Sequence, residues 1–430
     1  MRLYAPAVEA IQPMKTHPFA AHSYAAHSYA TLSWPLSGLL LCPLWACADA
    51  PLSAAPDGPS LVSTLAQPLV GETGPRATGR QATGRRLFEE ETFAGNGRTC
   101  ATCHGPETGT LAPEEAQRIH EEDPDDPLFL HDGSDDGLGQ GVSRLLEHAT
   151  ILVSVPLAPN VSLADEPEAR SVVLRRGIPS TLDTPALDPV LMLDGREPDL
   201  LAQAASAIRG HAQSPYEPSE EQLQAIADFE RGGAFFSSRE LRRFARGGPA
   251  PELPEGCSPE ERRGRRFFQD LPPDASGRDG LCASCHSGPL LNQTNQFLPL
   301  PIPVGSRFQT VGVSELNALG NPVRDFLFTA PDGTTTRVSS PDPGRALITG
   351  ELGEGTGSHL NAFKISSLWG VARTAPYFHD NSAKTLEDVV KHYALFFQAV
   401  TDPDGPGPAE PFLQLTEQEQ ADIVAFLRLL

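Results

Sequence analysis

Methionine is scarce in this chain of 430 residues, which contains only Met1, Met14 and Met192. Basic residues are also few, because 33 Lys and Arg stand against 55 Asp and Glu, and the formal net charge is −22. A chain this acidic is repelled by nucleic acid and by anionic membrane surfaces, so we expect neither as a partner. Beyond the N-terminal region, no apolar run is long enough to cross a membrane.

Four of the seven cysteines form two copies of one short pattern, at residues 100–104 and 282–286. Both copies read C-x-x-C-H, the attachment site of a c-type haem. The two thiols form thioethers with the haem vinyl groups, and the His coordinates the iron from the proximal side. A zinc site built from two C-x-x-C pairs is the alternative, but it does not require a His after each pair. The predicted haem-binding residues are Cys100, Cys103, His104, Cys282, Cys285 and His286.

The first 48 residues are typical of an export signal, because a short apolar run precedes small residues at 46–48 that suit cleavage. Residues 44–47 also resemble a lipoprotein box, so a lipid anchor on Cys47 stays open. Haem attachment to C-x-x-C-H occurs outside the cytoplasm in bacteria, and we therefore expect a periplasmic protein. Residues 49–82 are rich in Pro, Gly, Ala and Thr and are predicted to be a linker, with ordered structure beginning near Gly84.

Two helical patterns far apart in the sequence indicate an internal duplication. Residues 220–231 and 415–427 both carry apolar side chains at helical spacing, and each pattern lies far downstream of one haem motif. We expect a mainly α protein of two cytochrome c-like helical domains, each with one covalently bound haem. The predicted domains span residues 83–245 and 246–430.

An acidic segment lies between the first haem motif and the first of these helical patterns. From Glu121 to Asp136 there are eight carboxylates and two prolines. Such a segment is predicted to be a solvated loop, with calcium binding as the alternative.

Several further motifs carry a resemblance to a known family. They are residues 363–368, 374–380, 385–388, the lead-in 265–268 to the second haem motif, and Asp194–Gly195–Arg196 followed by Leu200 and Gln203. With these motifs the chain resembles the bacterial di-haem cytochrome c peroxidase family, which includes the MauG-like enzymes, over nearly all of its length after the linker. The resemblance implies that the C-terminal haem passes electrons to the N-terminal haem. There hydrogen peroxide would be reduced, or a ferryl oxidant formed. It also implies a small cytochrome or cupredoxin as electron donor, and homodimers are frequent in the family.

The sixth iron ligands implied by the resemblance differ between the two haems. Tyr393, seventeen residues after Pro376, matches the Met that ligates the electron-relay haem in the peroxidases, and MauG-like proteins have Tyr there. The alternative is that Tyr393 only packs and that His392 ligates. For the first haem, His120 matches a distal His of some family members, with an ordinary surface His as the alternative. Met192 lies in the wrong half of the chain to ligate the second haem.

Two positions depart from the family pattern where the peroxide chemistry would take place. Leu193 replaces a Trp between the haems, which would slow this step of electron transfer. Gln213 stands where the family has a Glu ten residues after Gln203, and an amide cannot take up and return a proton. His211, with an ordinary pKa of about 6.5, is the candidate substitute, and a solvated His is the alternative. The candidate catalytic residues are His211, Gln213 and Gln203.

The family also has a calcium ion between its domains. Its ligands include backbone carbonyls near Thr374 and Pro376, which are present, and an Asn that is matched here by Gly177. Calcium is therefore an expectation that the resemblance supports only in part.

These observations predict a di-haem oxidoreductase of the cytochrome c peroxidase and MauG-like kind. The alternative is a di-haem electron-transfer cytochrome without peroxidase activity, in which both irons are six-coordinate. The loss of the family's Trp, Glu and Met favours the alternative. A redox or gas sensor is a third possibility, but the sequence shows no separate signalling domain that would support it.

Overall fold

The computed structural model describes residues 75–272, 277–298, 302–353, 358–401 and 414–430. The predicted export signal, the lipidation candidate Cys47 and most of the predicted linker lie outside the described residues. All of the described residues belong to one compact unit.

Helix is the commoner element, as predicted for a mainly α chain. The α-helices are α1 (Pro75–Glu89), α2 (Pro113–Glu122), α3 (Ser143–His148), α4 (Thr184–Leu187), α5 (Leu200–Gly210), α6 (Glu220–Glu230), α7 (Arg239–Phe244), α8 (Pro259–Arg265), α9 (Val313–Leu316), α10 (Ala346–Thr349), α11 (Leu386–Thr401) and α12 (Glu417–Leu427). The short 3₁₀ turns are η1 (Cys100–Thr102), η2 (Pro127–Phe129), η3 (His131–Gly133), η4 (Gly233–Phe235), η5 (Arg266–Phe268) and η7 (Val371–Arg373). The strands are β1 (Thr150–Pro156), β2 (Val161–Leu163), β3 (Ser171–Gly177), β4 (Phe308–Gln309), β5 (Arg324–Thr329), β6 (Thr335–Ser340) and β7 (Phe363–Lys364).

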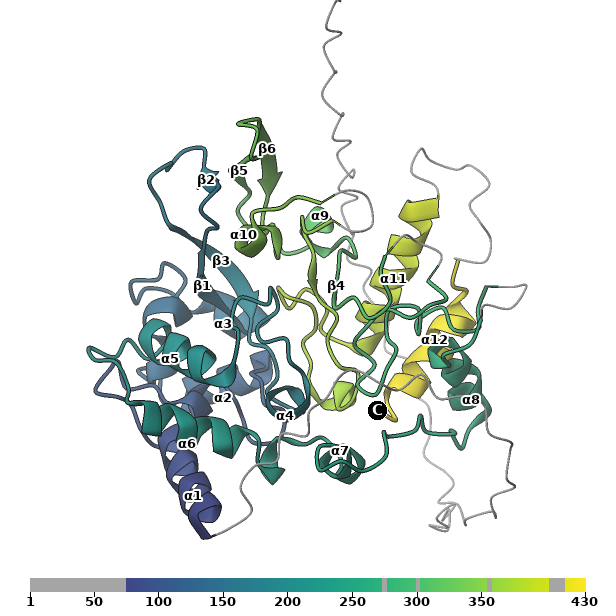
Figure 1. Cartoon of the computed structure of the whole chain (residues 1–430), viewed down its shortest axis with the longest axis horizontal. Helices are drawn as coiled ribbons and strands as arrows, with labels where there is room; N and C mark the ends of the chain where they lie inside the picture. Colours follow the sequence, from purple (N-terminus) through teal and green to yellow (C-terminus); the bar gives the residue numbers. More distant parts are fainter. Residues whose placement is uncertain (1–74, 273–276, 299–301, 354–357, 402–413) are drawn as a thin grey trace, which may run out of the picture. The chain divides into compact units, whose positions relative to one another are not determined.

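The same helix pair occurs in each half of the chain. The lead-in helix α1 packs on α6, and α8 packs on α12 in the same way (Figure 1). Each crossing depends on a glycine. A Cβ atom on Gly84 would lie 1.8 Å from the carbonyl oxygen of Ala225, and a Cβ on Gly264 would lie 2.0 Å from that of Asp422. The two helical patterns read from the sequence therefore form the closing helices of two similar units.

Helix α1 begins earlier than the sequence analysis predicted. Its first residue is Pro75, a favourable first helical position, whereas ordered structure was expected only near Gly84. The side chain of Arg80 pairs with Asp228 of α6 at 2.9 Å, so contact with α6 holds the early turns in helical form. The last part of the predicted linker 49–82 is therefore helical.

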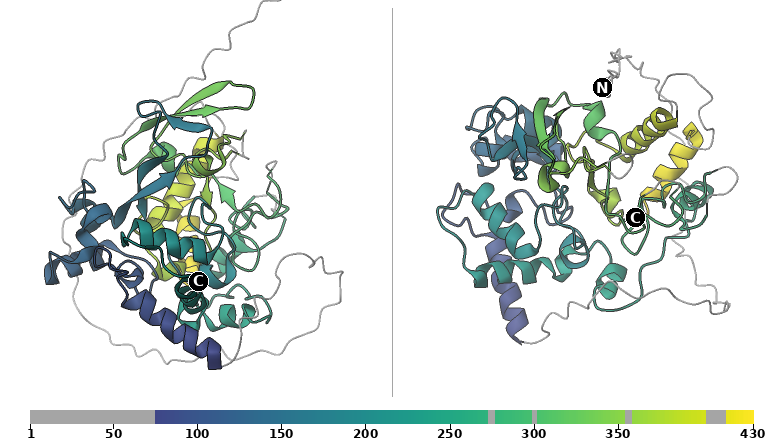
Figure 2. Two further views of the ribbon diagram at one scale, coloured as in Figure 1. Left: turned by 60° about the vertical axis from the view of Figure 1, so that its left-hand side comes forward. Right: turned by 45° about the horizontal axis from the view of Figure 1, so that its top comes forward.

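The strands were not predicted, and one sheet joins the two halves of the chain. β1 and β3 form an antiparallel pair in which Thr150 lies opposite Gly177. β2, β5 and β6 form a three-stranded antiparallel sheet in which Val161 of the first half pairs with Phe328 of the second (Figures 1 and 2). β5 and α10 thus contribute to the core of the first half, although the predicted domains divide at 245 and 246. Strand pairing over such a sequence distance leaves no local signal.

Helices long and apolar enough to cross a membrane do not occur among the residues that the structure describes.

Candidate haem sites

The two C-x-x-C-H motifs adopt the same tight turn. The backbone N–H of His104 donates to the carbonyl of Cys100 at 3.1 Å, and that of His286 donates to Cys282 at 2.9 Å. Each turn brings two cysteines and a histidine together within five residues. The sequence duplication is therefore also a duplication of local geometry.

Both histidines are oriented for iron through Nε2. The Nδ1 atom of His104 lies 2.8 Å from the carbonyl oxygen of Gly109, and that of His286 lies 2.9 Å from the oxygen of Leu291. A carbonyl only accepts, so Nδ1 carries the proton and Nε2 keeps its lone pair. Burial lowers the pKa of both imidazoles and so favours the neutral form that coordinates a metal.

The cysteines of the two motifs are half-buried, neutral thiols. Burial raises the pKa of Cys100 and Cys282 to about 12 and that of Cys103 to about 11. Among the described residues, no three or more His, Cys, Asp or Glu side chains converge as a metal site. The two thiol pairs therefore do not combine in the way that the alternative zinc site requires.

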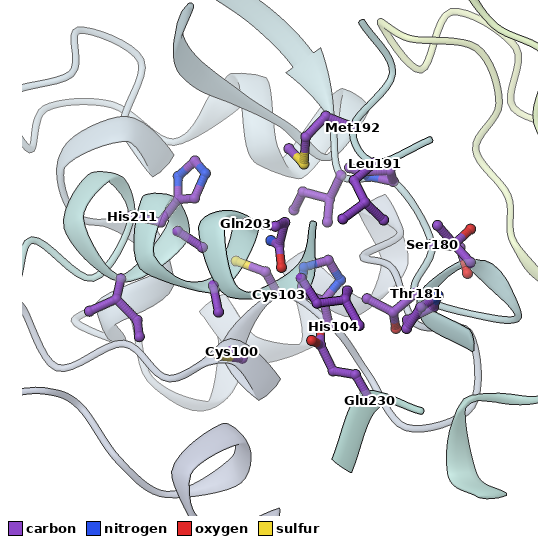
Figure 3. Close-up of a pocket in the computed structure, with 18 of the residues that line it drawn as sticks. Cys100, Cys103, His104, Ser180, Thr181, Leu191, Met192, Gln203, His211 and Glu230 are labelled. Carbon is purple, nitrogen blue, oxygen red and sulfur yellow. The ribbon is translucent and has the colours of Figure 1, made fainter. Parts of the chain in front are cut away.

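A large cavity opens beside the first motif, with about 1340 Å³ of empty space including the part that is open to solvent. Figure 3 shows His104, Cys100 and Cys103 at its wall, together with Gln203 from α5. The rest of the wall is largely apolar. A cavity that brings an Nε2-directed imidazole and two thiols to an apolar space fits a covalently attached haem.

The structure brings only part of the predicted catalytic set to this cavity. Gln203 and His211 line it, and so do Leu193, which stands at the family's Trp position, and Met192. Gln213 is exposed, has a left-handed φ of 54°, and is absent from the lining. The position that carries the family's acid–base carboxylate therefore does not reach the cavity here.

His211 is held by a partner that the sequence analysis placed in a solvated acidic loop. Its Nδ1 lies 2.6 Å from Oδ2 of Asp132, and the other oxygen of Asp132 accepts from Arg98. Arg98 is only 2% exposed. Although burial opposes ionisation, hydrogen bonding from His211 and the charge of Arg98 hold the pKa of Asp132 below its ordinary value. Asp132 was not recognised in the sequence because it is one of eight carboxylates in residues 121–136.

His120, the candidate distal ligand of the first haem, lies elsewhere. It is on α2, where its ring packs edge-on against Phe129 with a centroid separation of 5.1 Å. It does not line the cavity beside His104. The structure does not bring His120 and His104 together.

At the second motif, Tyr393 and His392 have different surroundings. Burial raises the pKa of the Tyr393 hydroxyl, and the nearby Cys285 and Cys282 raise it further, which places the phenol beside the haem-attachment thiols. His392 instead donates from Nε2 to the carbonyl of Val311 at 2.7 Å. The nitrogen that would bind iron is thus already engaged, and the geometry favours Tyr393 of the two.

The implied calcium ligands fit only in part. Thr374 and Pro376 still offer their backbone carbonyls, but Gly177 has no side-chain oxygen. A Cβ atom on Gly177 would lie 2.0 Å from Oδ1 of Asn381, whose amide nitrogen donates to the carbonyls of His148 and Ala149. The expected Asn ligand has no room at this position, and no step below depends on calcium.

Glu230 is a site residue that the sequence analysis missed. It is 4% exposed, lines the first cavity close to His104, and has one carboxyl oxygen without a hydrogen-bond partner among the described residues (Figure 3). Burial raises its pKa to about 8, so it is protonated at neutral pH. In the sequence, the only indication that Glu230 is buried was its position directly after Phe229, on a helix with apolar residues on the preceding turn.

Comparison with known proteins finds likenesses among solved structures only. No protein-family model and no curated protein matches the chain. A MauG-like protein associated with microbial copper homeostasis is 19% identical, over 84% of this chain and 90% of that one, with a TM-score of 0.40. The diheme peroxidase BthA from Burkholderia thailandensis is 16% identical, over 85% and 88%, with a TM-score of 0.43. Hydrazine synthase from Kuenenia stuttgartiensis is 16% identical, over 87% and 100%, with a TM-score of 0.34. The first two of these solved structures are a MauG-like protein and a diheme peroxidase, the kinds of protein that the sequence motifs resemble.

Proposed function

We propose that this protein is an exported di-haem oxidoreductase that reduces hydrogen peroxide at the haem bound by His104. The observation that carries the proposal is the cavity beside His104, which has a histidine, His211, and an amide, Gln203, in its wall. An electron carrier needs the same space for its haem but needs no histidine and amide beside it, whereas an enzyme needs a group that moves protons.

The overall reaction consumes one hydrogen peroxide, two electrons and two protons and releases two waters. When bound, the haem supplies the iron that delivers the electrons to the O–O bond. His211 takes a proton from one peroxide oxygen and returns it to the other, because its Nε2 is left free when Nδ1 bonds Asp132. Gln203 donates a hydrogen bond that orients the peroxide.

Electrons would enter at a haem held by His286 and Tyr393. An iron held by two protein ligands would suit electron relay rather than substrate binding. The two halves of the chain meet at the family's Trp position, where the backbone N–H of Lys364 donates to the carbonyl of Leu193 at 2.7 Å. This direct bond supports electron transfer through the backbone where the aromatic ring is missing.

The electron donor is proposed to be a small cytochrome or cupredoxin with a basic surface, which the charge of −22 would attract. A periplasmic location, a lipid anchor at Cys47 and a homodimer are part of the same proposal. They follow from the motifs and the family resemblance.

The test is low-temperature EPR of the oxidised mature protein, before and after one equivalent of hydrogen peroxide. A high-spin ferric signal that peroxide abolishes would support an open first iron. Consumption of peroxide with a reduced cytochrome as electron source would then establish turnover. Two low-spin signals that are unchanged by peroxide, in both the oxidised and the half-reduced protein, would overturn the proposal.

One observation favours the electron-transfer alternative. Met192 lines the same cavity, and Figure 3 shows its sulfur on the cavity side. A thioether is a common sixth ligand in electron-transfer cytochromes. Met192→Leu distinguishes the two functions. In an electron carrier, loss of the thioether would leave the first iron without its sixth ligand and change the haem spectrum. It would leave the spectrum of an already open iron unchanged.

A further inference from the structure

We infer that Asp132, held in turn by Arg98, is a positioning residue that keeps the His211 ring turned with Nε2 toward the first haem cavity. The inference rests on the proposed function, because it assigns the group that prepares His211 for proton transfer. The residues involved lie outside the motifs that the chain shares with the peroxidase family.

The ring of His211 is fixed by a charge-assisted hydrogen bond. Its Nδ1 lies 2.6 Å from the Asp132 carboxylate, which can only accept, so Nδ1 carries the proton. The remaining nitrogen, Nε2, is then the basic atom and belongs to a side chain that lines the cavity. A base oriented by a third group is a recurrent arrangement in catalysis.

The backbone of His211 is also fixed, by the segment that leads into the first haem motif. Asn96 donates from its side chain to the carbonyl of His211 at 2.8 Å, and its backbone N–H donates to the carbonyl of Ala212 at 2.8 Å. Asn96 stands four residues before Cys100. The peptide that attaches the haem therefore also sets the position of the histidine relative to it.

Arg98 determines where Asp132 lies. Its guanidinium donates to Asp132 and to the backbone carbonyls of Pro127, at 2.7 Å, and Leu128, at 2.8 Å, and to that of Leu130. These bonds tie turns η2 and η3 to the haem lead-in. An ion pair as buried as this one gives little net stability, because desolvation offsets the attraction. Its consistent effect is to hold the carboxylate in one place.

The groups that contact or act on His211 are Asp132 on η3, Arg98 on the lead-in, and His104, which also lines the cavity. The cavity wall also carries Arg176, Arg196, Glu230 and Lys364. Gln213, which takes the family's carboxylate position, is exposed and does not line the cavity. The carboxylate that assists proton transfer in the cavity is therefore Asp132. It acts through His211 and comes from a different segment of the chain than the family's Glu.

The experiment measures the rate of cyanide binding to the ferric holoprotein by visible absorption. Hydrogen cyanide binds iron as the anion, so its proton must pass to a base in the cavity, and the rate reports on that base without turnover. We expect D132N to slow binding by about 100-fold, the lower end of what a positioned general base contributes. H211Q should slow binding by a similar factor, and the double variant should be no slower than H211Q alone.

The matched control is D135N, which removes a carboxylate from the same loop. Asp135 accepts from the backbone of Ser143 and Arg144 and does not contact His211. Equal rates in D132N and D135N would overturn the inference and leave the proposed function standing. A wild-type protein that binds no cyanide would overturn both.

Should D132N fail to fold, D132E takes its place, because it keeps a charge beside Arg98 while lengthening the side chain by one methylene. Circular dichroism establishes folding before each rate is measured. Binding that is clearly slower in D132E than in D135N supports the inference, and equal rates overturn it. The pH profile of the rate provides a second readout. Its acidic limb, where the rate falls as the base in the cavity takes up a proton, should move to lower pH in D132N, because this variant lacks the negative charge that stabilises the protonated base. The limb should stay in place in D135N.

Discussion

The ammonium group of Lys364 lies 3.3 Å from the carboxylate of Asp188, in a buried pair that joins the second half of the chain to the first. Asp188 also accepts from Asn292 at 3.0 Å, and Lys364 donates to the carbonyl of Val190 at 3.0 Å. Burial lowers the pKa of Lys364, and the charge of Asp188 opposes that shift. The pair lies at the edge of the first haem cavity, which Lys364 also lines.

Removing one partner of this pair should destabilise the protein strongly. K364M leaves the buried Asp188 carboxylate with only the guanidinium of Arg307, at 3.8 Å, and loss of the closer cation is expected to cost up to about 3–5 kcal/mol. Denaturant unfolding of the holoprotein measures the loss. The exposed Lys384 provides the control, because K384M should change stability by less than about 0.5 kcal/mol. Similar losses of unfolding free energy in the two variants would mean that the buried pair stabilises the protein no more than an exposed lysine does.

The two helix crossings give a second prediction, with its control on the same helix. G84A places a methyl group against the backbone of Ala225 and should destabilise by about 1–3 kcal/mol. Gly79 has nothing within 4 Å of its added Cβ, so G79A should stabilise α1 by about 0.5–1 kcal/mol. Thermal unfolding of both variants tests this prediction. If helix propensity alone determined stability, both substitutions would be stabilising.

Much of the helical framework was predictable because its signals are local. The pattern over 415–427 forms α12, and its first turn has a capping box between Thr416 and Glu419. The β2–β5 pairing was not predictable, because three residues near 162 show no alternation that points to partners near 327. The N-terminal extension of α1 was missed for a related reason, since its stability comes from contact with α6 rather than from its own glycine-containing sequence.

A substitution at Tyr393 should affect one haem only. Y393F removes the hydroxyl that lies beside the second motif and is expected to change the visible and EPR spectra of the His286 haem, while the His104 haem stays unaltered. Y377F is the control, because the Tyr377 hydroxyl donates to the carbonyl of Val371 at 2.8 Å and has no expected role at iron. An unaltered spectrum in Y393F would remove Tyr393 as a ligand.

The candidate site was predictable where covalent chemistry fixes the spacing, and less so elsewhere. The C-x-x-C-H pattern indicates haem attachment from five residues alone. The Nδ1 hydrogen bonds of His104 and His286 leave Nε2 free for iron, as haem binding requires. Asp132 could not be singled out, because it is one of eight carboxylates in one segment and only the fold places it against Arg98 and His211. Glu230 was hidden for the same reason, on a helix that also has exposed carboxylates.

Glu230 makes the stability of the holoprotein depend on pH. Its pKa is about 8 in the folded protein, where burial raises it from an ordinary value of 4.5. Between these values the folded state holds a proton that the unfolded state has released, so the free energy of unfolding falls as pH rises through this window. E230Q removes this dependence and should be more stable than wild type at pH 8, with a smaller advantage at pH 6. E221Q, on the exposed side of α6, should unfold like wild type at both values. Denaturant midpoints for the three proteins test the assignment, and an E230Q advantage that stays constant with pH would show that Glu230 is already ionised in the folded protein.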